Sequence, residues 1–180
     1  MNNRTNFTDV LDFNNSFGVV VNDVPDKKIL VENPELVKLR LSLIEEEVNE
    51  LKDGLKNKDM NEVTDALADI LYVVYGAGVS FGIDLDEAFR IVHESNMSKL
   101  CNSEKDAEET VDWYIKNQSH RYDSPSIRKS EYGNKWVVYN KSTGKVLKSI
   151  YYKPPTFDDI LSKKHSIKQK GTEKSILEMM

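Results

Sequence analysis

The sequence predicts a mainly α-helical protein, in which a helical bundle is followed by a C-terminal extension that contains a β-hairpin. Three observations lead to this prediction. Segments between residues 34 and 98 carry apolar residues at alternating spacings of three and four, which is typical of helix faces. Helix-capping residues and short connections separate these segments, as in a bundle. After residue 100, aromatic and β-branched runs surround a glycine-containing turn, which indicates strands.

The N-terminal 33 residues predict a short helix and then a loop. Residues 7–17 place four apolar side chains on one side of a helix, namely Phe7, Val10, Leu11 and Phe13. Residues 18–33 contain Gly18 and Pro25 and are interpreted as a loop.

A long helix is predicted over residues 34–57. Asn33 can cap it, and Pro34 suits the first helical position. Gly54 interrupts an otherwise favourable pattern near its end. One stripe of apolar residues runs along this helix: Val37, Leu41, Ile44, Val48, Leu51 and Leu55.

Two further helices are predicted over residues 59–80 and 85–98, each opened by a capping box, at 59–62 and 84–87. The apolar stripe of the first of them should pack against the helix before it. This stripe comprises Val63, Leu67, Ile70, Val74 and Ala77. Because residues 70–75 are apolar almost all round, one neighbouring helix would not cover them.

The extension predicts a mixed structure. Residues 103–117 favour a short helix and residues 118–131 a loop. Residues 136–139 and 145–150 are β-like and should pair as a hairpin through the turn at 140–144, whose glycine suits a positive φ.

Length and composition limit the function classes. The 180 residues suit one domain with an addition, and we expect a bundle over residues 1–100, an extension over 101–160 and a flexible tail over 161–180. The net charge of −5 disfavours binding to a nucleic-acid polymer. One cysteine, Cys101, cannot form an internal disulfide. With no signal peptide or membrane-spanning segment recognised, we expect a cytoplasmic protein that does not bind membranes.

Acidic residues gather on one flank of each long helix. An α-helix advances by about 100° per residue, so acids on both helices fall between about 80° and 160° to one side of their apolar stripes. These are Glu47 and Glu50 on the first helix and Glu62, Asp65 and Asp69 on the second. On this count Glu46 faces away from the core.

Packing the two stripes together could gather these carboxylates at one groove. They would repel one another unless a cation lay between them, and oxygen ligands select Mg²⁺ or Mn²⁺. The alternative is a solvated acidic face, especially for the run 45–47, while Glu62 could act only as a helix cap. Asp69 argues for the cation, because it directly precedes the most apolar segment.

Together these residues resemble a known family. The segment Glu46-Glu47-Val48-Asn49-Glu50 resembles the EExxE signature of the all-α nucleotide pyrophosphohydrolases, which include the MazG-like proteins and phosphoribosyl-ATP pyrophosphohydrolase. The segment 62–65 matches the second half, ExxD, and another register ends at Asp69. Residues 65–76 and the block Asn96-Met97-Ser98-Lys99 are similar to a subgroup with dUTP or dNTP pyrophosphatase activity.

This resemblance implies a MazG-like bundle that hydrolyses dUTP or another dNTP at the α-phosphorus, with Mg²⁺, or Mn²⁺ in its place, as cofactor. Glu46 and Glu47 are then candidates to orient or deprotonate the attacking water. The candidate metal ligands are Glu47, Glu50, Glu62, Asp65 and Asp69. The candidate phosphate-binding residues are Asn96 and Lys99.

The sequence also allows alternatives for the function and for two tyrosines, and it predicts an oligomer. The same site would serve hydrolysis of phosphoribosyl-ATP in histidine biosynthesis, and a non-enzymatic helical interaction module is the alternative of another class. Tyr72 and Tyr75 could stack a base or pack in the core. The uncovered apolar surface of the second long helix predicts a homodimer or homotetramer.

Overall fold

The computed structural model describes residues 4–131 and 133–163. Its elements are α1 (Asn6–Phe17), α2 (Ile29–Glu32), α3 (Pro34–Asn57), α4 (Met60–Phe81), α5 (Leu85–Met97), α6 (Glu104–Gln118), β1 (Pro125–Lys129), β2 (Trp136–Asn140) and α7 (Asp158–Leu161). The mainly α-helical prediction is confirmed. The short α2 lies within a segment predicted as a loop, and the expected tail lies outside the described residues beyond residue 163.

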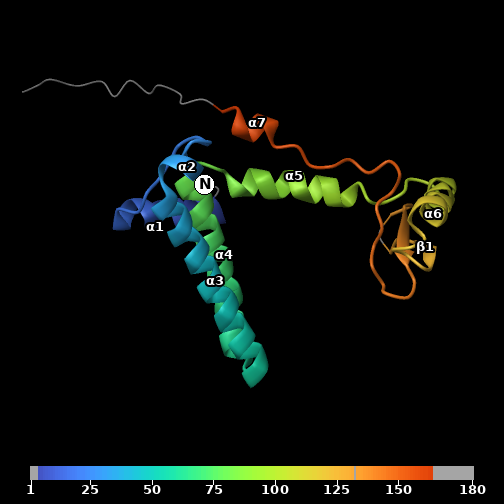
Figure 1. The fold of residues 1–180 in the computed structure, drawn as a ribbon, viewed down its shortest axis with the longest axis horizontal. Coiled ribbons are helices and arrows are strands. Elements are labelled where there is room, and N and C mark those ends of the chain that lie inside the picture. The colour runs from blue at the N-terminus through green and yellow to red at the C-terminus, as the bar shows by residue number, and fades with distance from the viewer. Residues whose placement is uncertain (1–3, 132, 164–180) are drawn as a thin grey trace, which may run out of the picture.

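The arrangement is elongated rather than spherical (Figure 1). Helices α3 and α4 form a long antiparallel hairpin, and α1 packs on α4 near the end of the hairpin where α4 finishes. Helix α5 leaves that end sideways and carries α6 and the small sheet at its far end. We call residues 99–151 the C-terminal unit. After it the chain returns along α5 to α7.

The predicted helix starts are correct because polar side chains satisfy the first amide groups. The Asn33 side chain accepts a hydrogen bond from the Leu36 amide at 3.2 Å. The Asp59 carboxylate accepts from the amides of residues 61 and 62, and that of Asp84 from the amides of residues 86 and 87. Helix α4 ends at Gly82, whose φ of 73° lies in the left-handed region.

Gly54 has a structural role that the sequence did not reveal. A methyl group on its α-carbon would lie 3.1 Å from both Glu62 Cβ and the Val63 backbone nitrogen. The glycine therefore lets α3 approach α4 closely at the lower end of the hairpin, where the acidic residues lie.

The apolar stripes of α3 and α4 are not fully covered within one chain. Several of their leucines keep about half or more of their surface exposed: Leu41 (55%), Leu55 (60%) and Leu67 (49%), with Leu71 (56%) beside them. A pair of helices has only one contact line, so residues on the outer part of each stripe need a further partner.

The C-terminal unit has its own buried core. Cys101, Ala107, Tyr114, Val138 and Leu147 form it, and partly buried side chains of α6 and both strands pack around them. Strands β1 and β2 pair antiparallel, with Ile127 opposite Val138.

The hairpin prediction is correct in its turn and partly correct in its pairing. The turn forms, since the Asn140 carbonyl accepts a hydrogen bond from the Gly144 amide at 2.8 Å and Gly144 has a φ of 70°. Past the turn the pairing is short: the Leu147 amide donates to the Val138 carbonyl at 2.8 Å, and Val146 forms an isolated bridge with Tyr139. The longer pairing of β2 is with residues 125–129, which were predicted as loop.

The second predicted strand stops because α6 takes its amide groups. The Lys148 amide donates to the Tyr114 hydroxyl at 3.1 Å, and the Ile150 amide donates to the Thr110 hydroxyl at 3.3 Å. These bonds turn the chain away from β2.

The returning segment is tied to α5 by two serines. The Ser95 hydroxyl donates to the Lys153 carbonyl at 2.8 Å, and the Lys153 amide donates to the Ser98 hydroxyl at 2.9 Å. Further along, Lys163 pairs with Glu87, and Ile160 is buried. Ser98, part of the third-helix block, therefore anchors the backbone.

Among the described helices, α4 alone is long and apolar enough to cross a membrane by length and composition, with a mean hydropathy of 1.2 over its most apolar window. A core helix of a soluble protein passes the same test, and α4 packs against α3 and α1. The length and composition of α4 are therefore weak evidence that this helix spans a membrane.

Candidate functional site

The lower part of the α3–α4 pair carries acids on facing flanks, and we call this group the acidic hairpin. It comprises Glu46, Glu47, Glu50 and Asp53 on α3 and Glu62, Asp65 and Asp69 on α4. The spacings within α4 are three and four, so its three acids lie on one side of the helix. The close approach at Gly54 brings this side next to α3.

Glu47 is the most constrained of these carboxylates. The side chain is half-buried, and its Oε2 atom is buried with no hydrogen-bond partner. Loss of solvation raises the pKa of Glu47 above its ordinary value, and repulsion from Glu50, Asp69, Glu46 and Asp65 raises it further. The structure therefore brings negative charges from both helices to an acceptor atom that lacks a donor.

A hollow of about 220 Å³ lies beside this point. It is lined by Glu50, Asp53, Asn57, Glu62 and Asp65. Glu50 and Asp65 belong both to this hollow and to the charges around Glu47. All five predicted metal ligands thus occupy one side of the hairpin.

Asp53 is a neighbour that sequence reasoning missed. It lies three residues after Glu50, a spacing that places two side chains on the same helical face. This spacing is the signal in the sequence that could have added Asp53 to the group of acids.

The donor set fits a hard cation, although the ligands are not gathered tightly. Among the residues that the structure describes, no group of three or more aspartate, glutamate, histidine or cysteine side chains is already close enough to hold a metal ion. The acidic hairpin offers only oxygen donors, and Glu47 Oε2 lacks a partner. Both features suit Mg²⁺ or Mn²⁺, which the side chains would have to converge to bind.

The other predicted site residues lie elsewhere in the chain. Asn96 and Lys99 are at the far end of α5, away from the acidic hairpin (Figure 1), and the Lys99 ammonium donates to Asn96 Oδ1 at 2.7 Å. Glu46 is exposed on α3. One chain therefore groups the metal candidates but does not bring the two phosphate-binding candidates to them.

Tyr72 and Tyr75 line a cavity of about 240 Å³ between α1 and α4. Tyr72 meets Phe13 edge to face with ring centroids 5.5 Å apart, and the Tyr75 hydroxyl donates to Asp86 at 2.8 Å. Ala68 lines both this cavity and an open hollow beside Glu62 and Asp65. Because both hollows include Ala68, Glu62 and Asp65 lie along the same surface of α4 as Tyr72 and Tyr75, and we call this surface the track.

Such a track can accept an elongated ligand. Carboxylates at one end can hold cations that bind phosphate oxygens and can orient a water molecule. An aromatic cavity at the other end can hold an apolar ring.

Comparison with known proteins agrees with this geometry. Residues 17–96 match the family model described as phosphoribosyl-ATP pyrophosphohydrolase. The matched segment contains the whole acidic hairpin and stops before Lys99 and the C-terminal unit.

A relative extends the similarity beyond this segment. The chain is 32% identical to uncharacterized protein L479 of Acanthamoeba polyphaga mimivirus over 240 aligned residues, which take in 87% of this chain and 96% of the relative. Because 240 positions exceed the 180 residues of this chain, the relative contains insertions. Residues 17–96 of the chain belong to the phosphoribosyl-ATP pyrophosphohydrolase family, within the MazG-like all-α nucleotide pyrophosphohydrolase superfamily.

Proposed function

We propose that this protein hydrolyses a nucleoside triphosphate, dUTP or another dNTP, to the nucleoside monophosphate and pyrophosphate, using Mg²⁺ with Mn²⁺ as a possible substitute. The observation that carries the proposal is the buried, unpartnered Glu47 Oε2 surrounded by four further carboxylates. A family whose members hydrolyse nucleotide pyrophosphate bonds supports it. We place the reaction in the cytoplasm, where the free, buried Cys101 would stay reduced.

In this proposal Glu47, Glu50, Glu62, Asp65 and Asp69 hold the metal. The bound ion would supply charge neutralisation for the phosphates and a lowered pKa for water. Glu46 or Glu47 accepts a proton from the water that attacks the α-phosphorus. The bond from the α-phosphorus to its bridging oxygen breaks, and pyrophosphate leaves.

The nucleoside would occupy the cavity of Tyr72 and Tyr75. This cavity shares Ala68 with the open hollow beside Glu62 and Asp65, so a triphosphate held by the acids would direct its sugar and base toward the tyrosines. Replacing Tyr72 with leucine should then raise KM more than it lowers kcat.

We also propose that the enzyme works as a homodimer or homotetramer. The exposed leucines of α3 and α4 form an apolar surface too extensive for a solvated hairpin. A second copy covering this surface would also allow Asn96 and Lys99 of one chain to approach the acidic hairpin of another, where they would bind phosphate oxygens.

Phosphoribosyl-ATP is the second candidate substrate, because the matched family model carries that description. The acidic hairpin suits either pyrophosphate bond. Only the region around Tyr72 and beyond can discriminate between the two substrates.

The test is a substrate panel. Purified protein with Mg²⁺ is incubated with each NTP, each dNTP and phosphoribosyl-ATP, and pyrophosphate release is measured, with Glu47→Gln as the matched inactive control. We expect release from at least one dNTP by the unaltered protein and not by the variant. Release from phosphoribosyl-ATP alone would replace the proposed substrate, and no release from any of them would overturn the proposal.

A further inference from the structure

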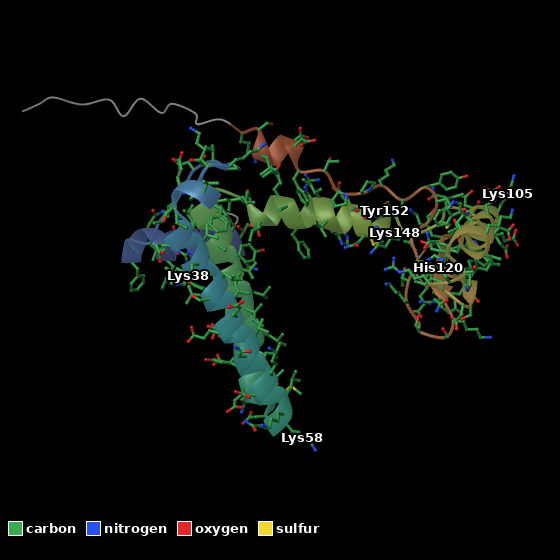
Figure 2. The ribbon with its side chains drawn as sticks, viewed as in Figure 1. Lys38, Lys58, Lys105, His120, Lys148 and Tyr152 are labelled. Atoms are coloured by element: carbon green, nitrogen blue, oxygen red, sulfur yellow. The ribbon has the colours of Figure 1, made fainter. Side chains whose placement is uncertain are left out.

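The C-terminal unit contains a pocket of a different character. Its volume is about 340 Å³, and it lies between α6 and residues 145–148. Its lining combines aromatic rings with cationic side chains: Trp113, Tyr122, Lys99, Arg121, Lys145 and Lys148. Figure 2 shows Lys148 near Tyr152 where the end of α5 faces this unit. The volume suits a ligand about the size of one nucleotide.

All charged side chains that line this pocket are cationic. No carboxylate lines it. Within residues 4–131 and 133–163, none of Arg121, Lys145 and Lys148 belongs to an ion pair. Three unpaired cations around one pocket, in a chain with net charge −5, favour an anionic ligand.

The cations are held beside rings. The Arg121 guanidinium lies 5.4 Å and the Lys145 ammonium 5.6 Å from the centre of the Tyr122 ring. The Lys148 ammonium lies 4.3 Å from the centre of the Tyr152 ring. These contacts orient the cationic groups without neutralising them.

Trp113 offers an aromatic surface beside these cations. Its side chain is 43% exposed, and its ring meets Tyr114 edge to face with centroids 5.0 Å apart. Tyr114 is itself buried and fixed by the hydrogen bond from the Lys148 amide. The indole is thus held in place while part of it remains open to a ligand. A held indole suits stacking of a nucleobase.

We infer that this pocket binds a free nucleotide, with the phosphates at Arg121, Lys145 and Lys148 and the base against Trp113. This site goes beyond the proposed hydrolase site, because it lies outside the family-matched residues 17–96. It belongs to the C-terminal unit, which lies at the end of α5 away from the α3–α4 pair (Figure 1). The C-terminal unit therefore binds a ligand separately from the substrate of the proposed hydrolase site.

A free nucleotide fits better than a nucleic-acid strand. The pocket is confined to one unit, and acidic side chains along α6 would repel phosphates that continue beyond it. These are Glu104, Asp106, Glu108, Glu109 and Asp112.

Tryptophan fluorescence provides a direct test, since the two tryptophans, Trp113 and Trp136, both belong to the C-terminal unit. The full chain is titrated with ADP in EDTA, which prevents metal-dependent binding at the acidic hairpin. We expect saturable quenching by ADP and much weaker effects of adenosine and of pyrophosphate alone. Equal binding of pyrophosphate and ADP would overturn the role of Trp113. Tighter binding of a single-stranded oligonucleotide would overturn the assignment to a free nucleotide.

Variants separate this site from general charge attraction. Arg121→Gln and Lys148→Gln should each weaken ADP binding by about tenfold. Lys141→Gln, which removes an exposed lysine of the same unit that does not line the pocket, should leave it unchanged. An equal loss in all three variants would contradict a specific site.

Two further variants make the outcomes independent of the proposed hydrolase. Glu47→Gln should abolish pyrophosphate release and leave ADP binding unchanged. Trp113→Phe should retain weakened binding, measured by equilibrium dialysis, while losing the quenching. Loss of ADP binding in Glu47→Gln would show that the acidic hairpin, not the C-terminal unit, holds the nucleotide.

Discussion

The α3–α4 hairpin with the packed α1, here called the hairpin region, differs from the C-terminal unit in how its buried polar groups are paired. In the described residues, every buried side-chain polar atom that lacks a partner belongs to α1 or α3, on Asn14, Arg40 and Glu47. The C-terminal unit instead encloses a contiguous apolar core. It also satisfies its buried Asn140, whose side chain bonds Asp123, Ser142 and the amide of Ser124.

Because of this difference, we expect the hairpin region, and not the C-terminal unit, to need a bound ligand or a partner chain. Unpaired buried groups and exposed leucines are each unfavourable. In our proposal, a cation at Glu47 and a second copy over the leucines would complete the hairpin region. The C-terminal unit needs neither to close its core. The family match covers α3 and α4 and excludes the C-terminal unit.

The largest expected effect is on catalysis. Asp69→Asn keeps the size of the side chain but removes a charge that acts on Glu47. Pyrophosphate release should fall by about a hundredfold to ten-thousandfold. Without metal, the melting temperature should stay the same or rise, because repulsion is relieved. Asp112→Asn on α6 is the control, and a similar loss of activity there would contradict the division between the regions.

The next effect concerns the apolar surface of the hairpin. Leu67→Glu with Leu71→Glu places charges where we expect a second copy to pack, so the assembly should dissociate. Light scattering should show a monomer at micromolar concentration, with a lower melting temperature. Val146→Glu, at an exposed position of the C-terminal unit, is the control. A monomeric unaltered protein would refute the assembly.

A smaller effect is expected at the close approach of α3 and α4. Gly54→Ala forces a shift, because the new methyl group would meet backbone and Cβ atoms of α4 at 3.1 Å. Stability should fall by about 1–3 kcal/mol, and the Mg²⁺-induced rise in melting temperature should shrink. Lys56→Ala, exposed on the same helix, should change neither quantity.

How far the sequence predicted the molecule differs between the regions. Periodicity and caps are local signals, so they located α3, α4 and α5 closely and put five carboxylates on matching flanks. They could not show that Gly54 is a contact point, because that depends on the neighbouring helix. Nor could they show that α6 side chains take the amides of Lys148 and Ile150, which limits the pairing of residues 145–150 with β2.

For the candidate site, the sequence predicted the grouping of the carboxylates but not the separate position of Asn96 and Lys99. The spacing of Glu47, Glu50, Asp65 and Asp69 sufficed because all four depend on two helices that pack along their length. Asn96 and Lys99 are separated from them by the direction of α5, a tertiary feature that no local pattern encodes.

The smallest effects are opposite responses to pH in the two regions. The pKa of Glu47 is raised above 4.5 in the folded chain, so the folded state binds its proton more tightly. Without metal, this contribution to stability is greatest in acid and is lost as the pH rises through the raised pKa. The pKa of Asp123 is lowered from 3.8 to about 2 by hydrogen bonds from Ser142, Asn140 and Ser124. That contribution is present above 3.8 and is lost as the pH falls toward 2.

Two optical signals can follow these responses in one protein. Helices α3 and α4 supply about half of the helical residues that the structure describes and so a large share of the far-ultraviolet signal, whereas tryptophan fluorescence reports only the C-terminal unit. In EDTA, acidification from neutral pH through the raised pKa of Glu47 should stabilise the unaltered chain relative to Glu47→Gln by the helix signal. Below pH 3.8, the fluorescence transition of the unaltered chain should converge with that of Asp123→Asn. Saturating Mg²⁺ should remove the first difference and leave the second, because only the carboxylate of the hairpin would then be bound by the ion. A second difference that also vanished with Mg²⁺ would mean that the two regions do not respond separately.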